Sequence, residues 1–278
     1  MNKQMVPEVP GVPDPPRPDP PRPDPLETPD PPQPSDPDLV GASILPFTID
    51  TTFGNTYFLL AKERFVEGWR GSQTWSDFGG RRENGEAAEA CAAREFHEET
   101  MAMVPVTPLE NTLSDAALIA RGARRDTHVV ARGLAAGGFT LRVNVTSETG
   151  TYTTFVKQVP WRPGCQDTFQ TVLRKANSGR LGTTHAACMA DGVVPDAFLE
   201  KTCVRLWSVA QLRRLVTDTR RRRGPERLRW GFHERLGAIL DQFPGNSMFA
   251  RKPAGCGPGG PGCGQGGTRI SLETYGKQ

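Results

Sequence analysis

Residues 80–102 read GRRENGEAAEACAAREFHEETMA, a glycine-rich start followed by alanines and a run of glutamates. Alanine and glutamate favour a helix, and on a helix Glu95, Glu98 and Glu99 are related as i, i+3 and i+4 and share one face. Like charges at this spacing each cost a helix roughly a few tenths of a kcal/mol. We therefore expect a hard divalent cation, Mg²⁺ or Mn²⁺, over this face. The alternative is a solvated glutamate-rich helix without a site.

The stretch resembles the Nudix box, whose pattern is Gly, five residues, Glu, seven residues, Arg-Glu, an apolar residue, any residue, Glu-Glu, any residue, Gly and an apolar residue. Eight of the nine fixed positions match, among them the opening glycine and the arginine. Both gap lengths match as well. Met101 is the departure, because the family has a glycine there. Such a glycine is normally left-handed, a conformation that costs other residues roughly 1–2 kcal/mol. We therefore expect the helix to run on slightly, with Pro105 as its latest stop.

The resemblance implies a role for each carboxylate of the box. Glu95, Glu98 and Glu99 would bind one to three metal ions that bridge a diphosphate. Such ions neutralise phosphate charge and lower the pKa of a bound water, so the implied reaction is hydrolysis of a pyrophosphate linkage. The role carried over to Arg94 is to orient carboxylates, with Glu86 as its partner from the preceding loop. Gly80 opens that loop.

The general base stays open at this point. Glu98 or Glu99 could accept the proton of the attacking water, but family members differ, and many take the base from a later loop. Glu200 precedes a predicted strand at Thr202–Trp207. A glutamate near such a strand supplies an extra metal ligand or base in some Nudix enzymes. The alternative for Glu200 is an exposed glutamate at a strand end.

Composition divides the chain into three parts. Between Val6 and Asp38 lie 15 of the 26 prolines, so we expect residues 1–38 to form an extended, disordered tail that buries no core. This tail would act as a spacer or bind a partner that has an aromatic groove. Residues 39–243 form the predicted Nudix domain, with a loop-rich insertion at about 179–195. Residues 244–278 are predicted to be a flexible tail rich in glycine and proline.

The block 39–243 predicts both strands and helices. Short apolar runs at Ala42–Ile49 and Thr56–Lys62, separated by a Phe-Gly-Asn turn, indicate two strands before the box. Further strands are predicted at Thr127–Ala131, Phe139–Thr146, Thr151–Val159 and Leu199–Trp207, and helices at Cys165–Ala176, from Val209 and at Glu226–Gln242. This mixture suggests an α/β/α sandwich around a mixed sheet, which is also the arrangement of the Nudix fold.

The resemblance further implies a substrate that contains a nucleoside diphosphate. A basic patch of Arg213, Arg214, Arg220–Arg223, Arg227 and Arg229 could hold RNA phosphates or a polyphosphate, or could be a solvated helix end. The segment Trp75–Gly80 and the insertion are similar to Nudix proteins of large DNA viruses, some of which remove mRNA caps. Capped RNA is therefore the first expected substrate, followed by diphosphoinositol polyphosphate and free nucleotides.

A protein of another functional class would also carry these features. It would be a non-catalytic Nudix fold that holds a nucleotide or RNA while the proline-rich tail recruits a partner. Met101 is the residue that favours this hypothesis.

The expected location follows from features that the sequence lacks. It has no secretory leader, no long apolar span and no Cys-x-x-Cys pair among its six cysteines. We therefore expect a soluble intracellular protein, in the cytoplasm and without a membrane partner.

Overall fold

The computed structural model describes residues 38–107, 127–162, 164–177, 196–220, 226–243 and 268–274. The proline-rich segment 1–37, the predicted insertion at 179–195 and most of the predicted tail 244–278 lie outside these residues. Within the described ranges, no helix is both long and apolar enough to cross a membrane.

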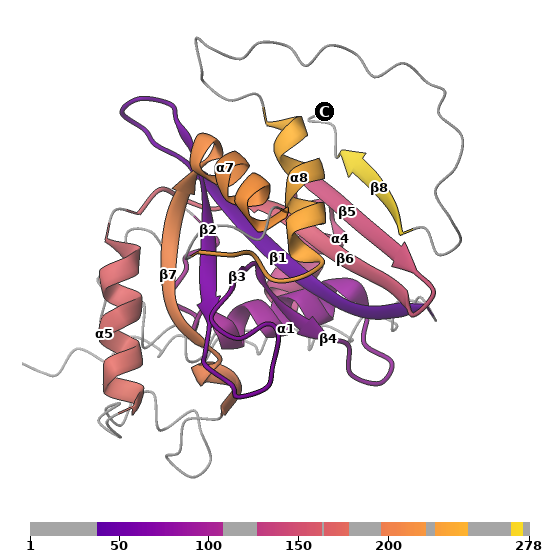
Figure 1. Cartoon of the computed structure of the whole chain (residues 1–278), viewed down its shortest axis with the longest axis horizontal. Coiled ribbons are helices and arrows are strands. Elements are labelled where there is room, and N and C mark those ends of the chain that lie inside the picture. Colours follow the sequence, from indigo (N-terminus) through magenta and orange to yellow (C-terminus); the bar gives the residue numbers. More distant parts are fainter. Residues whose placement is uncertain are drawn as a thin grey trace, which may run out of the picture. The chain divides into compact units, whose positions relative to one another are not determined.

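One mixed sheet of eight strands underlies the described part of the chain (Figure 1). The strands are β1 (Leu39–Ile49), β2 (Thr56–Glu63), β3 (Trp75–Ser76), β4 (Phe78–Arg81), β5 (Leu141–Ser147), β6 (Gly150–Gln158), β7 (Lys201–Ser208) and β8 (Arg269–Thr274). The main path is β3-β2-β1-β6-β5-β8, with β4 paired to β1 and β7 paired to β2. Only β1 and β6 pair in parallel among these strands. β1 pairs with β2, β4 and β6, so it lies inside the sheet.

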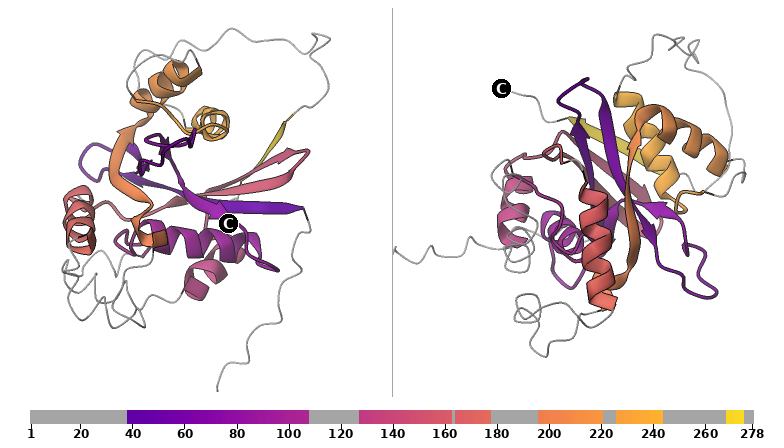
Figure 2. Two further views of the ribbon diagram at one scale, coloured as in Figure 1. Left: turned by 60° about the horizontal axis from the view of Figure 1, so that its bottom comes forward. Right: turned by 90° about the vertical axis from the view of Figure 1, so that its left-hand side faces the viewer.

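Helices cover both faces of this sheet, as Figure 2 shows from two directions. The helices are α1 (Ala88–Glu99), α4 (Thr127–Ala135), α5 (Cys165–Asn177), α7 (Val209–Arg220) and α8 (Phe232–Gln242), with a 3₁₀ turn η1 at Asp196–Leu199. Buried residues of α1, α4 and α5 share one hydrophobic cluster, and those of α7 and α8 share the other. The predicted α/β/α sandwich with a mixed sheet is confirmed.

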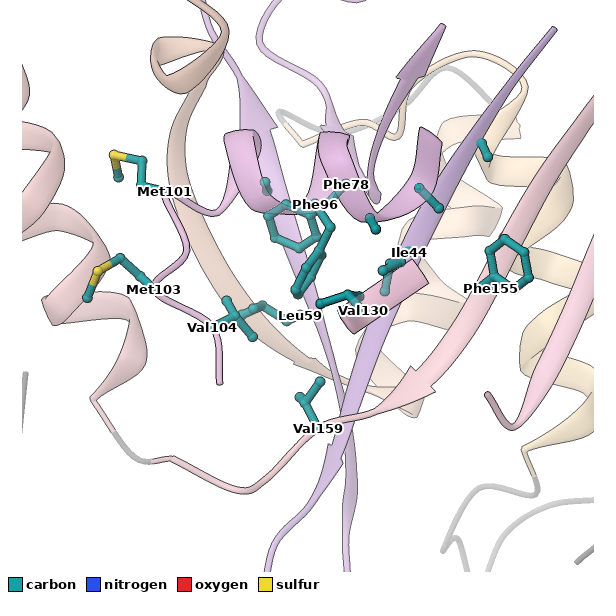
Figure 3. Close-up of a cluster of buried hydrophobic side chains, with 14 of the residues drawn as sticks. Ile44, Leu59, Phe78, Phe96, Met101, Met103, Val104, Val130, Phe155 and Val159 are labelled. Atoms are coloured by element: carbon teal, nitrogen blue, oxygen red, sulfur yellow. The ribbon is translucent and has the colours of Figure 1, made fainter. Parts of the chain in front are cut away.

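Alternation along β1 separates the two clusters. Ala42 and Ile44 belong to the cluster under α1, whereas Leu45 belongs to the cluster under α7 and α8. A strand that is buried on both faces is expected to be apolar almost throughout, as β1 is. Phe96 of α1 meets Phe78 of β4 edge to face, with ring centroids 5.6 Å apart (Figure 3). This contact fixes the glutamate-bearing helix on the sheet.

Residues 127–131, which were predicted to form a strand, begin helix α4 instead. The prediction rested on a short run that contains two β-branched valines. Over the longer segment, Val130 and Leu134 are four residues apart and both are buried in the cluster under α1. Packing of this helical face against α1 outweighs the local strand preference.

Two other segments differ from the sequence-based prediction. The helix predicted at Glu226–Gln242 begins only at Phe232, because residues before it form a bridge in which Leu228 pairs with Trp75. Residues 269–274, for which no strand was predicted, form β8 against β5. This pairing joins segments about 130 residues apart, so local sequence gives little indication of it.

Helix α1 ends at Glu99 and does not run on as expected from Met101. Met101 and Ala102 both adopt the left-handed conformation, with φ of 49° and 53°. Both side chains are buried, each with about 1% of its surface exposed. Apolar burial of Met101 in the cluster under α1 compensates for its backbone strain, so methionine supports the turn that glycine makes in the family pattern.

Glycine substitutions separate strain from packing at this turn. Both Met101→Gly and Ala102→Gly relieve a left-handed backbone, but only the first removes a large buried side chain. We expect Met101→Gly to lower the free energy of unfolding by about 2–4 kcal/mol, and Ala102→Gly to change it by less than about 1 kcal/mol. Urea unfolding of the two variants and the wild type measures both changes. A gain in stability from Met101→Gly would show that strain outweighs packing.

Candidate functional site

Strand β4 brings glycine backbone directly against α1. A Cβ at Gly80 would lie 2.5 Å from the carboxyl carbon of Glu95, so a larger residue there would displace this carboxylate. The N–H of Gly79 donates to Oε2 of Glu99 at 2.6 Å. Two of the three carboxylates predicted to bind metal therefore lie against the backbone of the loop that begins at Gly80.

Arg94 connects the loop to the exposed carboxylates of α1. Its guanidinium donates to both oxygens of Glu86 at 3.1 Å, to Glu95 at 2.8 Å and to Glu98 at 3.4 Å. A further bond reaches the carbonyl of Arg81 at 3.1 Å. Burial alone would lower the pKa of Arg94, but its bonds to Glu86 and the charge of Glu95 raise it above the ordinary value. The guanidinium is therefore a permanent cation at the centre of this carboxylate group.

Glu200 lies close enough to α1 for its charge to act on Glu95 and Glu98. Burial raises the pKa of both α1 carboxyls, Arg94 opposes that rise, and the negative charge of Glu200 adds to it. The carbonyl of Glu200 accepts from the N–H of Arg64 at 2.8 Å, which fixes the backbone before β7. Glu200 thus lies within electrostatic range of Glu95 and Glu98, although it is 102 positions after Glu98 in the sequence.

Glu99 lies in different surroundings from Glu95 and Glu98. Only 3% of its side chain is exposed, and Oε1 is 2.9 Å from Nζ of Lys201. Its other oxygen accepts the Gly79 N–H. Burial raises the pKa of Glu99 well above the ordinary value, and the attraction of Lys201 only partly opposes this.

Lys201 is the centre of a buried ionic network. Its Nζ is fully buried and lies 2.7 Å from Oε1 of Glu63, in addition to its contact with Glu99. It also donates to the hydroxyl of Ser76 at 3.0 Å. Burial would lower the pKa of Lys201, but the charges of Glu99 and Glu63 raise it, so the ammonium stays charged. Lys201 faces two buried carboxylates, and the repulsion between Glu63 and Glu99 adds to the burial that raises the pKa of Glu99.

Sequence reasoning missed Lys201 and Glu63. Lysine at the start of a strand and glutamate at the end of one are usually exposed, and no periodic pattern distinguishes these two. They are 138 residues apart and meet only because β2 pairs with β7. Neither a motif nor helical or strand periodicity could have found this network.

A second polar network lies on the sheet near α8. The carboxylate of Asp77 accepts from the hydroxyl of Ser43 at 2.6 Å and from Arg235 at 3.2 Å. The Arg235 guanidinium also lies over the Tyr152 ring, 4.3 Å from its centroid. Burial raises the pKa of Tyr152, and the charge of Asp77 adds to that rise, which keeps the phenol neutral. This network attaches α8 to β1 and β6.

The carboxylates near α1 suit a hard divalent cation chemically, but they are not already gathered around one. Across the described residues, no three His, Cys, Asp or Glu side chains form a group that could hold an ion as they stand. Arg94 occupies oxygens of Glu95 and Glu98. These two glutamates also repel each other and are repelled by Glu200, so an additional cation would relieve that repulsion.

Replacing Lys201 by methionine tests the buried network. We expect Lys201→Met to lower the free energy of unfolding by about 3–5 kcal/mol near pH 8, because two buried carboxylates lose their cation. The loss should shrink toward about pH 5. A carboxyl whose folded pKa lies above its unfolded pKa stabilises the fold at low pH and loses that contribution as pH rises through the folded value. Burial makes Glu99 such a group. Urea unfolding at the two pH values measures this dependence.

Lys62→Met is the matched control, since Lys62 pairs with Glu226 at 3.3 Å but both side chains are partly exposed. Its change in stability should stay within about 1 kcal/mol at either pH. Equal effects of the two substitutions, or a loss in Lys201→Met that does not depend on pH, would contradict the proposed charge balance.

Known proteins with a related sequence or structure were compared with the chain. Residues 40–150 match the family described as NUDIX domain. No curated protein matches the sequence. A Nudix hydrolase from M. smegmatis, RenU, is 16% identical, with a TM-score of 0.35, and the match covers 74% of this chain and 89% of that one. A NUDIX hydrolase from Alicyclobacillus acidocaldarius is 13% identical, with a TM-score of 0.37 and coverage of 74% and 92%.

The family assignment depends on the domain match and not on these distant structures. The matched residues include Gly80, Glu86 and the whole run from Arg94 to Glu99. Divalent cations are the usual cofactors of this family. Residues 40–150, which include the glutamate-rich helix and the strands around it, are therefore similar to the NUDIX domain.

Proposed function

We propose that the protein is a Mg²⁺- or Mn²⁺-dependent hydrolase that cleaves the pyrophosphate linkage of a nucleoside diphosphate derivative. The observation that supports this most directly is the set of carboxylates around Arg94, which contacts Glu86, Glu95 and Glu98. Glu200 adds a fourth negative charge beside them. A site this acidic repels a diphosphate unless a metal ion lies between them.

The residues proposed to hold the ion are Glu95 and Glu98 of α1, with Glu200 as an additional ligand. An ion bound there would neutralise phosphate charge and lower the pKa of a water molecule. Glu99 is the third carboxylate predicted from the box. Both of its oxygens are already bonded within the chain, one to the Gly79 N–H and one to Lys201. Glu99 can therefore bind the ion only if the ion replaces Lys201.

The proposed general base is Glu98. About 24% of its side chain is exposed, more than that of Glu86 or Glu95, so among these three carboxylates it is the most open to water. Burial raises the pKa of Glu98, and the charge of Arg94 opposes that rise. In the proposed reaction a water oxygen bonds to phosphorus while its proton passes to Glu98, and the bridging oxygen leaves with the other phosphate. Arg94 keeps the Glu98 side chain in place.

Changing Glu98 to glutamine tests this role. We expect turnover to fall at least about a hundredfold while ligand affinity changes little, because the lost group acts mainly in the transition state. Steady-state hydrolysis of ADP-ribose and related compounds with Mg²⁺ or Mn²⁺, together with calorimetric binding, measures both quantities. Glu89→Gln is the matched control: it lies on the same helix but pairs with Arg142 outside the Arg94 group, and its turnover should equal that of the wild type.

The same assay distinguishes the substrate classes. It should include capped RNA, diphosphoinositol polyphosphate, nucleoside diphosphate sugars and nucleoside triphosphates. Capped RNA was the first expectation because of the basic patch, but Arg213 donates to the carbonyls of Leu240 and Phe243 at the end of α8. Those bonds give this arginine a structural role on the face of the sheet opposite α1. Wild type that binds ligands and turns over none of the panel would favour a non-catalytic binding protein.

We also propose that the catalytic domain runs from about residue 39 to residue 243, with β8 added to its sheet. The proline-rich segment before it is proposed to contribute no core and no catalytic group, and to be available to a partner. Removal of residues 1–37 should leave turnover within about twofold of the wild type. This truncation keeps Asp38, whose carbonyl accepts from the N–H of Thr151 at 2.7 Å. A truncated protein that folds but has lost its turnover would show that the segment belongs to the active site.

A further inference from the structure

Three large aromatic side chains are exposed without belonging to either core cluster. They are Phe65, Trp69 and Trp230, with 72%, 39% and 78% of their surface exposed. Phe65 and Trp69 lie in the connection between β2 and β3, and Trp230 lies just before α8. Isolated exposed aromatics are common, but here two segments that are far apart in sequence bring them to one part of the fold.

Backbone bonds hold these two segments together. The N–H of Trp75 donates to the carbonyl of Arg227 at 2.8 Å, and the N–H of Arg229 donates to the carbonyl of Trp75 at 2.8 Å. In Figure 1 the chain before α8 passes across the β3 region accordingly. Arg229 is therefore fixed at a defined position beside the β2–β3 connection.

The side chain of Arg229 forms a stacked pair with Trp69. Its guanidinium lies over the Trp69 ring, 5.5 Å from the centroid. The ring itself packs closely on the backbone of Gly71, where any Cβ would collide with it. Nη1 of Arg229 lies 3.4 Å from Oε1 of the buried Glu63, which holds the guanidinium in place. The Arg229 side chain nevertheless stays 39% exposed. The cation and the ring thus lie in contact, and each has a second contact that holds it in place.

This surface is connected to the catalytic helix by two routes. Glu63 also binds Lys201, which binds Glu99, so one continuous ionic chain joins Arg229 to the end of α1. In the second route, the β2–β3 connection begins at Arg64, whose N–H donates to the carbonyl of Glu200. The first route separates Arg229 from the carboxylate of Glu99 by two side chains, and the second joins the segment that carries Trp69 to the backbone of Glu200.

We propose that Arg229 and Trp69 form the subsite for the nucleobase of the substrate, with the pyrophosphate extending from it toward α1. The inference rests on the proposed function and adds the chemical class that this part of the site recognises. A planar base stacks on an aromatic ring or on a guanidinium plane, and the second of these also attracts the neighbouring phosphates. Glu63 fixes the plane of Arg229 without covering it.

Kinetics of Trp69 variants test the subsite with ADP-ribose and Mg²⁺. We expect Trp69→Ala to raise KM about tenfold or more, with kcat within about twofold, because stacking binds the ground state and the transition state alike. Trp69→Phe should keep most of the affinity, and Arg229→Lys, which keeps the charge but loses the plane, should also raise KM. Phe53→Ala is the matched control, since Phe53 is also an exposed aromatic residue but lies in the turn at the opposite end of β2. Its KM should not change.

The two proposals fail in different ways. Unchanged KM in Trp69→Ala and Arg229→Lys, while Glu98→Gln still abolishes turnover, would overturn the subsite and leave the hydrolase intact. Absence of turnover in the wild type would overturn the proposed function instead. In that case calorimetry of ADP-ribose with Glu98→Gln and with the double variant Glu98→Gln/Trp69→Ala tests the subsite alone. A loss of affinity of about tenfold in the double variant supports it, and equal affinity, or no binding to either protein, overturns it.

Discussion

A single buried ammonium group holds together the parts of the structure that carry the site. Nζ of Lys201 binds Glu63 at 2.7 Å and Glu99 at 2.9 Å, so it joins β2, β7 and the last turn of α1 at one point. An uncompensated charge at such a position costs several kcal/mol, and therefore all three elements must meet there for the fold to be stable. The position of α1 relative to the loop at Gly80 depends on this contact.

The two cations of the site divide its carboxylates into two groups with different properties. Lys201 is completely buried and takes Glu63 and Glu99 out of contact with solvent. Arg94 is partly exposed and contacts Glu86, Glu95 and Glu98, which leaves these oxygens accessible to an ion and to water. Glutamates that are adjacent in sequence, Glu98 and Glu99, thus lie in opposite environments. Burial and charge, and not residue type, distinguish the structural carboxylate of Glu99 from the Glu98 carboxylate that we propose to be catalytic.

The same ionic network extends to the surface where we propose substrate recognition. Glu63 contacts Lys201 on one side and Arg229 on the other. Two cations thereby compensate the buried charge of Glu63. One is the buried Lys201, and the other is the partly exposed Arg229, which lies over the Trp69 ring. A network of this kind keeps the guanidinium in a fixed plane, which reduces the entropy lost when a ligand stacks on it. Stability and recognition therefore depend on neighbouring atoms of one network.

The sequence by itself determined that Glu95, Glu98 and Glu99 lie on a helix, that they share one of its faces and that this stretch resembles the Nudix box, because these features depend on spacings within about 20 residues. It failed at Thr127–Ala131 and at Met101, where packing against α1 and burial in the core outweigh local preference. Only the tertiary structure decided the pairing of Lys201 with Glu63, the strand β8 and the position of Glu200 beside α1. Those contacts join segments roughly 100 or more residues apart, and their energies depend on burial and charge that arise only when the sheet has formed.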